Sequence, residues 1–274
     1  MSAAPKLGIL AGGGTAPLSL VQACRDLNRD FFVIGLEGQA NADFSGTPHD
    51  WVSLGEGAKL KGLIADNQIQ EIVMIGRVRR PSLTELRPDF VAIKMLMKVG
   101  LNSAGDDELL TSIGKAIEDE CGVRVIGAHE VFAGLLTPEG QLGHVTPDEE
   151  AQKDITRGIE IAKSLGKLDV GQSVIVQQGI VLGVEAIEGT DALIVRSAGL
   201  RREGPGGILI KIAKPQQDNR YDLPTVGPDT IAAMAKAGLR GVALEAGRSL
   251  LIEREKTTRL ADEANIFIIA RKIS

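Results

Sequence analysis

Residues 7–17 read Leu7-Gly8-Ile9-Leu10-Ala11-Gly12-Gly13-Gly14-Thr15-Ala16-Pro17, and this stretch decides the fold of the first half of the chain. Its apolar start has the composition of a buried strand, the three glycines indicate a tight turn, and Pro17 suits the first turn of a helix. A strand, a glycine-rich turn and a helix in this order are typical of a βαβ unit with a parallel sheet.

The same alternation continues over the first half of the chain. Further strands are predicted at Phe31–Leu36, Glu71–Ile75 and Val123–Ile126, and helices at Pro17–Leu27, Lys59–Asn67, Phe90–Lys98 and Asp107–Glu120. Short β-branched runs between longer helical segments favour a parallel sheet covered by helices. The sequence therefore predicts an α/β protein whose N-terminal domain, residues 1–136, is Rossmann-like.

The periodicity lapses into Gly, Pro and Thr between about residues 134 and 147, where we expect the domain boundary. The second domain, residues 137–274, has a mixed α/β pattern. A helix follows Thr146-Pro147-Asp148, and Gln178-Gly179 predicts a hairpin. The predicted elements are helices Glu149–Leu165, Thr190–Arg196 and Pro228–Ala237, and strands Ser173–Gln177, Ile180–Glu185, Gly207–Ile212, Val242–Leu244 and Ile266–Ile269.

Composition excludes several classes of protein. The 274 residues carry a formal net charge of -5, which argues against nucleic-acid binding because that needs an excess of Lys and Arg. Two cysteines and the absence of a signal segment favour a cytoplasmic protein with reduced thiols. Since no apolar stretch approaches the roughly 20 residues that span a bilayer, we expect membrane contact to be peripheral.

The glycine turn is a candidate phosphate site. Backbone N–H groups of Gly12, Gly13 and Gly14 at the start of a helix can approach an anion without obstruction by a Cβ. The dinucleotide pattern G-x-G-x-x-G would need glycine where the chain has Pro17, although Glu37 after the second strand keeps a nicotinamide cofactor open. A tight turn without any ligand is also open.

Basic residues cluster in both halves of the chain. Arg77, Arg79 and Arg80 follow the strand that ends at Ile75, and Arg201 and Arg202 lie in the second half. Such clusters either cover the surface with solvated charge or bind phosphate, for which the arginine fork is suited.

The stretch from the end of the strand at 207–212 to the start of the helix at 228–237 holds the densest set of reactive side chains. Three cations and three carboxylates fall within it: Lys211, Lys214, Arg220, Asp218, Asp222 and Asp229. Carboxylate oxygens and a diphosphate together suit Mg²⁺, and the cations can neutralise the phosphates. Asp229 is better explained as the cap of the following helix. For Asp222, the alternative that it is a simple turn residue stays open.

Other acidic residues and the histidines carry weaker signals. Glu185 and Glu245 each end a predicted strand and can face a cleft, whereas Asp106 and Asp107 suit the start of a helix. The three histidines lack metal-ligand spacing, so zinc is not expected.

Several motifs together resemble one known family, the LpxI family of UDP-2,3-diacylglucosamine pyrophosphatases, over nearly the whole chain and in the same order. They are Leu7 to Gly14 with Pro17, Gly76-Arg77-Val78-Arg79-Arg80-Pro81, Gly105-Asp106-Asp107-Glu108-Leu109-Leu110, Val181 to Asp191, and Asp222-Leu223-Pro224-Thr225-Val226-Gly227-Pro228-Asp229-Thr230.

The resemblance implies magnesium-dependent hydrolysis of UDP-2,3-diacylglucosamine to UMP and 2,3-diacylglucosamine 1-phosphate (lipid X), a cytoplasmic step of lipid A assembly. It implies a substrate chamber between the two domains and attack by water at the sugar-side phosphorus. The essential acidic residue of the family corresponds to Asp222. A homodimer and transient contact with the inner membrane are left open.

We accordingly expect three sets of site residues. The expected metal ligands are Asp222, Asp218 and Glu185, and the expected catalytic residues are Asp222, Lys211, Lys214 and Arg220. The expected substrate contacts are Gly12, Gly13, Gly14, Arg77, Arg80, Thr190, Asp191 and Gln217. An oxidoreductase using NAD(P) and a non-catalytic protein that binds sugar nucleotides or lipids are the alternatives.

The helix predicted at Phe90–Lys98 is a candidate apolar surface for the acyl chains. Its apolar residues are Val91, Ile93, Met95, Leu96, Met97 and Val99. Because they cover most of the helix, ordinary burial in the core is the favoured interpretation.

Overall fold

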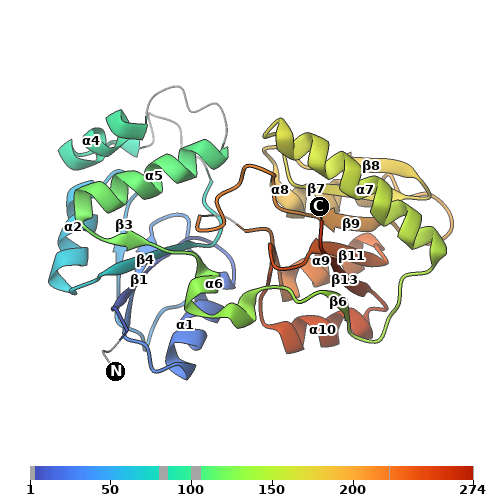
Figure 1. Cartoon of the computed structure of the whole chain (residues 1–274), viewed down its shortest axis with the longest axis horizontal. Helices are drawn as coiled ribbons and strands as arrows, with labels where there is room; N and C mark the ends of the chain where they lie inside the picture. The colour runs from blue at the N-terminus through green and yellow to red at the C-terminus, as the bar shows by residue number, and fades with distance from the viewer. Residues whose placement is uncertain (1–3, 80–85, 100–105, 222, 274) are drawn as a thin grey trace. The chain divides into compact units, whose positions relative to one another are not determined.

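The structure is a computed structural model that describes residues 4–79, 86–99, 106–221 and 223–273. It forms two compact units (Figure 1). Unit 1 comprises Met1–Ala133 together with Asp218–Asp222, and unit 2 comprises Gly134–Gln217 and Leu223–Ser274. The sequence placed the boundary at 136/137 and assigned all later residues to the second domain, whereas the structure returns a short segment of the later chain to unit 1.

Unit 1 is built on a parallel sheet of five strands in the order β3-β2-β1-β4-β5. The strands are β1 (Leu7–Ala11), β2 (Phe31–Leu36), β3 (His49–Val52), β4 (Glu71–Ile75) and β5 (Arg124–Val125). The helices are α1 (Ala16–Asp26), α2 (Gly57–Asp66), α4 (Phe90–Val99), α5 (Asp106–Cys121) and α6 (Ala128–Val131). This strand order confirms the predicted Rossmann-like arrangement.

The side on which the chain adds strands to this sheet changes between β1 and β4. From β1 the next strand lies on one side, as β2, and the chain later returns to the other side, as β4. All five residues of β1 are buried, as a central parallel strand requires. In open α/β sheets ligands bind beyond the carboxyl ends of the strands at such a reversal, and here that position is occupied by the glycine turn after Ala11.

Unit 2 contains a mixed sheet of six strands in the order β6-β13-β11-β9-β7-β8, and a small parallel pair, β10 with β12. The strands are β6 (Gly140–Leu142), β7 (Ser173–Gln177), β8 (Ile180–Val184), β9 (Ile208–Lys211), β10 (Thr225–Val226), β11 (Gly241–Glu245), β12 (Leu250–Leu251) and β13 (Phe267–Arg271). The helices are α7 (Glu149–Lys167), α8 (Gly189–Ala198), α9 (Pro228–Ala237) and α10 (Arg254–Glu263).

Strands β9, β11 and β13 are parallel, whereas β6 and the hairpin β7–β8 extend the sheet in antiparallel register. Helix α7 covers one face of the sheet, where Ile155 packs with Ile208 and Ile210. Helices α8, α9 and α10 contribute to the core on the other face. The predicted hairpin and the predicted mixed α/β class are both confirmed.

The start of α7 shows how local sequence sets this arrangement. Asp148 is the N-cap and accepts a hydrogen bond of 2.7 Å from the backbone N–H of Ala151, so Pro147 precedes the cap instead of opening the helix. Within the helix, the buried Asp154 accepts from the N–H groups of Gln178 and Gly179. The helix thereby fixes the β7–β8 turn as well as the core.

Helix α4 departs from the burial that we expected for its apolar residues. Phe90, Ile93 and Met97, which recur at helical spacing, are 81%, 43% and 79% exposed, while Ala92 is buried. Val91, Met95 and Leu96 are half-buried. The helix therefore packs through part of its circumference and leaves an apolar face uncovered. Within the described residues, no helix is both long and apolar enough to cross a membrane.

Candidate functional site

The glycine turn of unit 1 is held by the segment that follows β4. Gly12 N–H donates to the carbonyl of Ile75 at 2.8 Å, and Gly13 exchanges two hydrogen bonds with Arg77 at 2.8 and 2.9 Å. The N–H of Gly14 donates to Oδ1 of Asn41 at 2.9 Å. All three predicted phosphate donors thus already have protein acceptors, and a phosphate would replace Asn41 or use N–H groups further along the turn.

Close approach of two chain segments explains why glycine occupies these positions. A Cβ at Gly12 would lie 2.5 Å from the carbonyl oxygen of Arg77, and one at Gly13 would lie 2.9 Å from that of Gln39. Gly76 has φ +98°, and its Cβ would lie 2.8 Å from Gly12. Packing therefore accounts for these glycines, and phosphate binding by them stays a prediction.

Two of the three clustered arginines lie beside this turn. The side chains of Arg77 and Arg79 are exposed, and the backbone N–H of Arg79 donates to Gln39. Arg80 lies outside the described residues. Glu37, on which the nicotinamide alternative depends, accepts a hydrogen bond from the hydroxyl of Ser53. Its carboxylate is therefore already engaged at the end of β2.

Residues 218–221, which we call the strap, belong to unit 1 although the chain on both sides belongs to unit 2. Arg220 donates to both carboxylate oxygens of Asp218 at 2.8 to 3.1 Å, and its Nη1 lies 3.8 Å from Glu118 on α5. Hydrogen bonds from Arg220 hold the pKa of Asp218 below its usual value. Asp222, the next residue, lies outside the described residues.

In unit 2 a set of buried polar groups collects where the central strands end. Ser173 begins β7, Lys211 ends β9 and Glu245 ends β11, and the antiparallel register pairs Ser173 with Lys211. All three are buried. We define the carboxyl-edge cluster as Ser173, Glu185, Thr190, Lys211, Lys214, Glu245 and Arg248. Buried charges are unfavourable unless they are paired, so such a concentration needs a reason.

One chain of hydrogen bonds in this cluster joins a cation to a carboxylate through a hydroxyl. Lys211 Nζ donates to Thr190 Oγ1 at 2.7 Å, and Thr190 Oγ1 lies 2.6 Å from Glu185 Oε1, to which it donates. Ser173 Oγ lies 3.4 Å from the same hydroxyl. Lys211 therefore meets Thr190 and Glu185, two predicted residues from the Val181 to Asp191 motif, at one point of the sheet edge.

A second cation of the cluster is neutralised directly. Lys214 Nζ forms an ion pair with Asp169, and both side chains are largely buried. The backbone N–H of Lys214 donates to Gln217 Oε1 at 3.0 Å, so the predicted substrate contact Gln217 also shapes the loop. Asp169 was not foreseen, because it stands alone after α7 with no motif around it.

Glu245 connects this loop to the sheet. Its Oε2 accepts from the N–H of Ala213 at 3.1 Å, and its Oε1 lies 3.3 Å from Arg248 Nη1. Arg248 Nη2 in turn donates to the carbonyl of Lys214 at 3.3 Å. Arg248 was also missed from sequence, although the signal existed in an arginine three residues after an acid that ends a strand.

Two further acids occupy first turns of helices. Asp191 lies half-buried in the first turn of α8, and Asp229 is exposed in the first turn of α9. The N-cap of α9 is Gly227, and no side chain caps that helix by a hydrogen bond. Asp229 therefore interacts with the helix dipole through its charge alone, which corrects the predicted cap.

The predicted magnesium site includes Asp222, which lies outside the described residues. Across residues 4–79, 86–99, 106–221 and 223–273, no three His, Cys, Asp or Glu side chains come together around a metal position. The carboxylate of Asp218 accepts hydrogen bonds from Arg220, and that of Glu185 accepts one from Thr190. These two acids also belong to different units. Magnesium binding by Asp222, Asp218 and Glu185 therefore stays a prediction.

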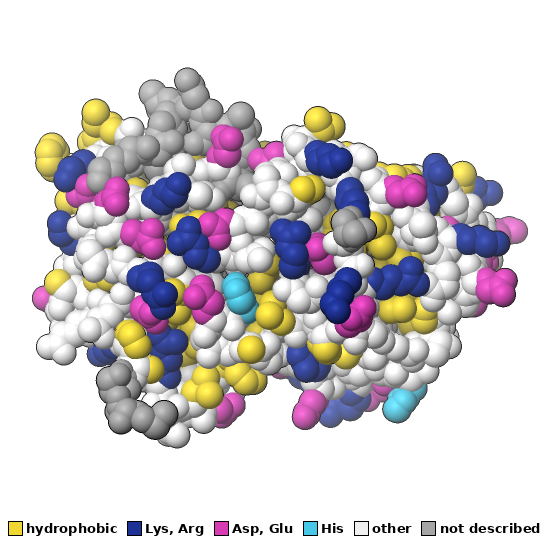
Figure 2. Space-filling model, in the orientation of Figure 1, with side chains coloured by type: hydrophobic (Ala, Val, Ile, Leu, Met, Phe, Trp, Pro, Cys, Tyr) yellow, Lys and Arg dark blue, Asp and Glu magenta, His cyan; other side chains and the backbone are white. Residues whose placement is uncertain are grey.

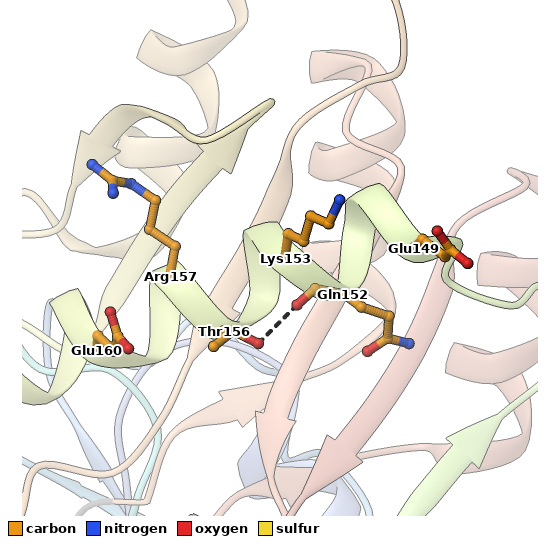
Figure 3. A pocket seen from close by; sticks show the side chains of 6 residues that line it. All are labelled: Glu149, Gln152, Lys153, Thr156, Arg157 and Glu160. Atoms are coloured by element: carbon orange, nitrogen blue, oxygen red, sulfur yellow. Dashed lines mark hydrogen bonds between the residues drawn. The ribbon is translucent and has the colours of Figure 1, made fainter.

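A shallow groove of about 540 Å³ runs along the exposed face of α7 (Figure 3). It is lined by Glu149, Gln152, Lys153, Thr156, Arg157 and Glu160, all from this one helix. Figure 3 shows the charged side chains pointing outward, with Thr156 donating to the Gln152 carbonyl. Because no predicted site residue lines it, we assign this groove to the solvated side of the helix.

Charge on the surface is mixed. Figure 2 shows Lys and Arg side chains interspersed with Asp and Glu over the visible face, in keeping with the net charge of -5. On this face the charges form no continuous basic field of the kind that sequence-independent binding of nucleic acid requires.

Two solved structures show weak likeness to this chain. CobK precorrin-6A reductase has 10% identity and a TM-score of 0.32, with 98% of this chain and 89% of that chain covered. The UDP-glucose 4-epimerase of Thermus thermophilus, in complex with NAD, has 13% identity and a TM-score of 0.32, with 98% and 86% covered. Likeness at this level carries no information on ligand or activity.

Sequence relatives are far closer. Models of the LpxI N-terminal domain and the LpxI C-terminal domain match residues 6–135 and 138–269. A protein of Caulobacter vibrioides named UDP-2,3-diacylglucosamine pyrophosphatase LpxI is 38% identical in an alignment 271 residues long that covers 96% of each chain. Since both domain models match in order and the relative aligns over nearly its full length, the chain belongs to the LpxI family.

Proposed function

We propose that this protein hydrolyses the pyrophosphate bond of UDP-2,3-diacylglucosamine, giving UMP and 2,3-diacylglucosamine 1-phosphate for lipid A assembly. The observation that carries the proposal is the alignment over 96% of both chains with a relative named for that substrate. The carboxyl-edge cluster supports chemistry in addition to binding, because it concentrates buried cations and carboxylates where α/β sheets place their ligands.

The reaction needs charge stabilisation more than it needs a covalent intermediate. The oxygen of water forms a bond to one phosphorus, the bond from that phosphorus to the bridging oxygen breaks, and the water gives up a proton. Negative charge collects on the departing phosphate. Fixed cations stabilise such charge most effectively in a site from which water is largely excluded.

Lys211 and Lys214 suit this role because their positions are set before substrate arrives. Thr190 and Asp169 hold the two ammonium groups at the sheet edge, and an ammonium group carries three N–H donors. In our proposal the diphosphate interacts with both of these charges. Arg220 contributes a third cation, and Gln217, Thr190 and Asp191 contribute polar contacts to the substrate.

Unit 1 is proposed to contribute phosphate or nucleotide contacts through the glycine turn and the exposed Arg77, together with Arg80. The start of α1 supports this assignment. Pro17 stands in the first turn of that helix, and the positive end of the helix dipole favours an anion there.

We propose Mg²⁺ as the cofactor, with Asp222 as its main protein ligand. Bound to the diphosphate, the ion would supply charge neutralisation and polarisation of a phosphoryl oxygen. Removal of metal by EDTA should abolish UMP release, and added Mg²⁺ should restore it. Full activity in EDTA, combined with full activity of Asp222→Ala, would remove the metal from the proposal.

Contact with the membrane surface is proposed for the uncovered face of α4, defined as Phe90, Ile93 and Met97. The substrate named for the relative carries two acyl chains, which reside in or next to a bilayer. An exposed apolar face with Lys94 beside it suits insertion at the headgroup boundary. This contact would bring the protein to its substrate without a membrane-spanning segment.

The proposed activity is tested with purified protein and UDP-2,3-diacylglucosamine, by measuring the initial rate of UMP release. Wild type should release UMP together with an equal amount of diacylglucosamine 1-phosphate. Asp222→Asn should lose at least about 100-fold in kcat, as expected for a group at the reacting centre. Asp229→Asn, an exposed acid on the following helix, is the matched control and should retain activity.

Two results of this assay would overturn the proposal. Saturable binding of the substrate with no UMP formed would identify a binding protein. Equal rates for wild type and Asp222→Asn would place the chemistry elsewhere in the chain.

A further inference from the structure

The strap reaches unit 1 from a chain that is fixed in unit 2 just before it. Gln216 Nε2 donates to the carbonyl of Gly166 at 2.8 Å, and Gln217 accepts from the backbone of Lys214. Directly afterwards the chain crosses, and Asp218–Asp222 counts with unit 1. The chain then returns at Leu223. Whatever holds the strap therefore also fixes the backbone beside the proposed catalytic acid, Asp222.

Tyr221 is the side chain that inserts the strap into unit 1. It is 6% exposed and belongs to the same core cluster as Phe32 and Ile117, with Leu110 and Ile113 of α5 packed against that cluster. An aromatic side chain buried in a core contributes more apolar contact than any other kind of residue.

The ring of Tyr221 packs directly against Gly114. A Cβ at this position would overlap Cε1 of Tyr221 and would approach Cζ at 2.7 Å and Cδ1 at 2.9 Å. Gly114 stands inside α5, where glycine is disfavoured relative to alanine. The Tyr221 ring explains the glycine at position 114, because any larger residue there would displace the ring from its contact with α5.

Neighbouring contacts align the rest of the strap on unit 1. The Arg220 guanidinium lies 4.9 Å from the centroid of the Tyr221 ring, within the range of a cation–π interaction. A Cβ at Gly127 would lie 3.2 Å from the carbonyl oxygen of Asn219, so a second glycine permits close approach of the strap backbone. The hydroxyl of Tyr221 is buried and has no hydrogen-bond partner among the described residues. The anchor therefore depends on the shape of the ring.

We infer that Tyr221, whose ring packs against Gly114, is a positioning residue for Asp222, the residue that follows it in the chain. Consecutive Cα atoms are about 3.8 Å apart, so displacement of Tyr221 displaces the backbone of Asp222 directly. The inference rests on the proposed function, since it gives Asp222 the role assigned there.

The test compares two leucine substitutions in the same core cluster, Tyr221→Leu and Phe32→Leu. Both replace a buried ring in unit 1 by a smaller apolar side chain, and only the first lies in the strap. For Tyr221→Leu we expect kcat for UMP release to fall at least about 10-fold while KM stays within about twofold. Phe32→Leu should melt at a comparably lowered temperature and keep its kcat.

Two further variants separate ring shape from other effects. Tyr221→Phe should retain wild-type kcat, because the hydroxyl has no partner to lose among the residues that the structure describes. Gly114→Ala should lower both kcat and the melting temperature in the wild-type background. When Gly114→Ala is added to Tyr221→Leu, kcat should not fall further. The melting temperature of the double variant should equal or exceed that of Tyr221→Leu, since alanine favours the helix once the ring has gone.

The outcomes distinguish this inference from the proposed function. A wild type that forms no UMP removes the proposed function. An active wild type whose kcat survives Tyr221→Leu, or falls equally in Phe32→Leu, overturns the positioning role. Additive effects of Gly114→Ala and Tyr221→Leu on kcat would also overturn it, because the two substitutions act on one contact.

Discussion

The ammonium of Lys211 and the hydroxyl of Thr190 are joined by a hydrogen bond of 2.7 Å, and the same hydroxyl donates to Glu185. This bridge places a buried positive and a buried negative charge on opposite sides of one oxygen. It links the end of β9 to the start of α8, two elements that carry separate sequence motifs. Removing the bridge should therefore affect both stability and turnover.

Thr190→Val removes the hydroxyl and keeps the shape of the side chain. We expect a loss of about 1–3 kcal/mol in unfolding free energy, because Glu185 and Lys211 lose a buried partner. We also expect kcat/KM to fall about 10-fold or more, since Lys211 is no longer held. Thr156→Val is the control, because the Thr156 hydroxyl donates to the carbonyl of Gln152 on the exposed face of α7. Unchanged turnover in Thr190→Val would show that the bridge serves structure alone.

The Lys214–Asp169 pair should behave as one energetic unit. Either Lys214→Met or Asp169→Asn leaves the other charge poorly compensated, and each should lower the unfolding free energy by about 1–3 kcal/mol. The double variant should lose less than the sum of the two, as urea unfolding of all four proteins would reveal. Strict additivity would mean that the ion pair contributes nothing.

Cys24 and Cys121 predict the behaviour of unit 1 at high pH. Burial raises the pKa of each thiol to about 11 from 9.0. Because the folded state holds these protons more tightly, their contribution to stability is complete below pH 9 and is lost as pH rises towards 11. Urea unfolding at about pH 8 and about pH 10.5 should show a decline of up to about 4 kcal/mol from the two thiols.

The matched control for this pH effect is Cys24→Ala combined with Cys121→Ala. Tyrosine and lysine also titrate in this range, so only the difference between the two proteins reports the thiols. An identical decline in the control would contradict the effect. Native protein at about pH 8 should also react slowly with a thiol reagent until it is unfolded.

The apolar face of α4 should govern binding to lipid vesicles. Phe90→Ser combined with Met97→Ser should reduce flotation with anionic phospholipid vesicles several-fold and leave the melting temperature nearly unchanged, because both side chains are exposed. Leu168→Ser removes an apolar side chain that is 74% exposed in unit 2 and should have little effect. Equal vesicle binding by all three proteins would remove α4 as the contact.

Much of the fold was predictable because the buried strands are recognisable in the sequence as apolar runs. β1 and β2 are apolar runs, and the predicted bounds of β2, Phe31–Leu36, are the observed ones. Helix α10 was missed because its sequence, REKTTRLADE, buries only Thr257 and Ala261 and so shows no apolar stripe. The short edge strand β6 gave no signal either, since its three residues alternate too briefly.

The site was predictable as a set of residues more than as an arrangement. Lys211, Thr190 and Glu185 were each selected from their motifs, but only the pairing of Ser173 with Lys211 brings them together. The strap shows the limit most clearly. Sequence assigned Arg220 and Asp218 to the second domain, whereas the structure counts them with unit 1. The neighbouring Tyr221 packs there against Gly114, which looks like an ordinary helical glycine in the sequence.

Cleavage of the UDP-2,3-diacylglucosamine pyrophosphate by water can be followed by mass spectrometry of the products formed in ¹⁸O-enriched water. We predict equal amounts of UMP and diacylglucosamine 1-phosphate, with a single ¹⁸O carried by the sugar phosphate. Label in UMP would move the attack to the other phosphorus. Intact substrate, or products without label, would contradict hydrolysis by this protein.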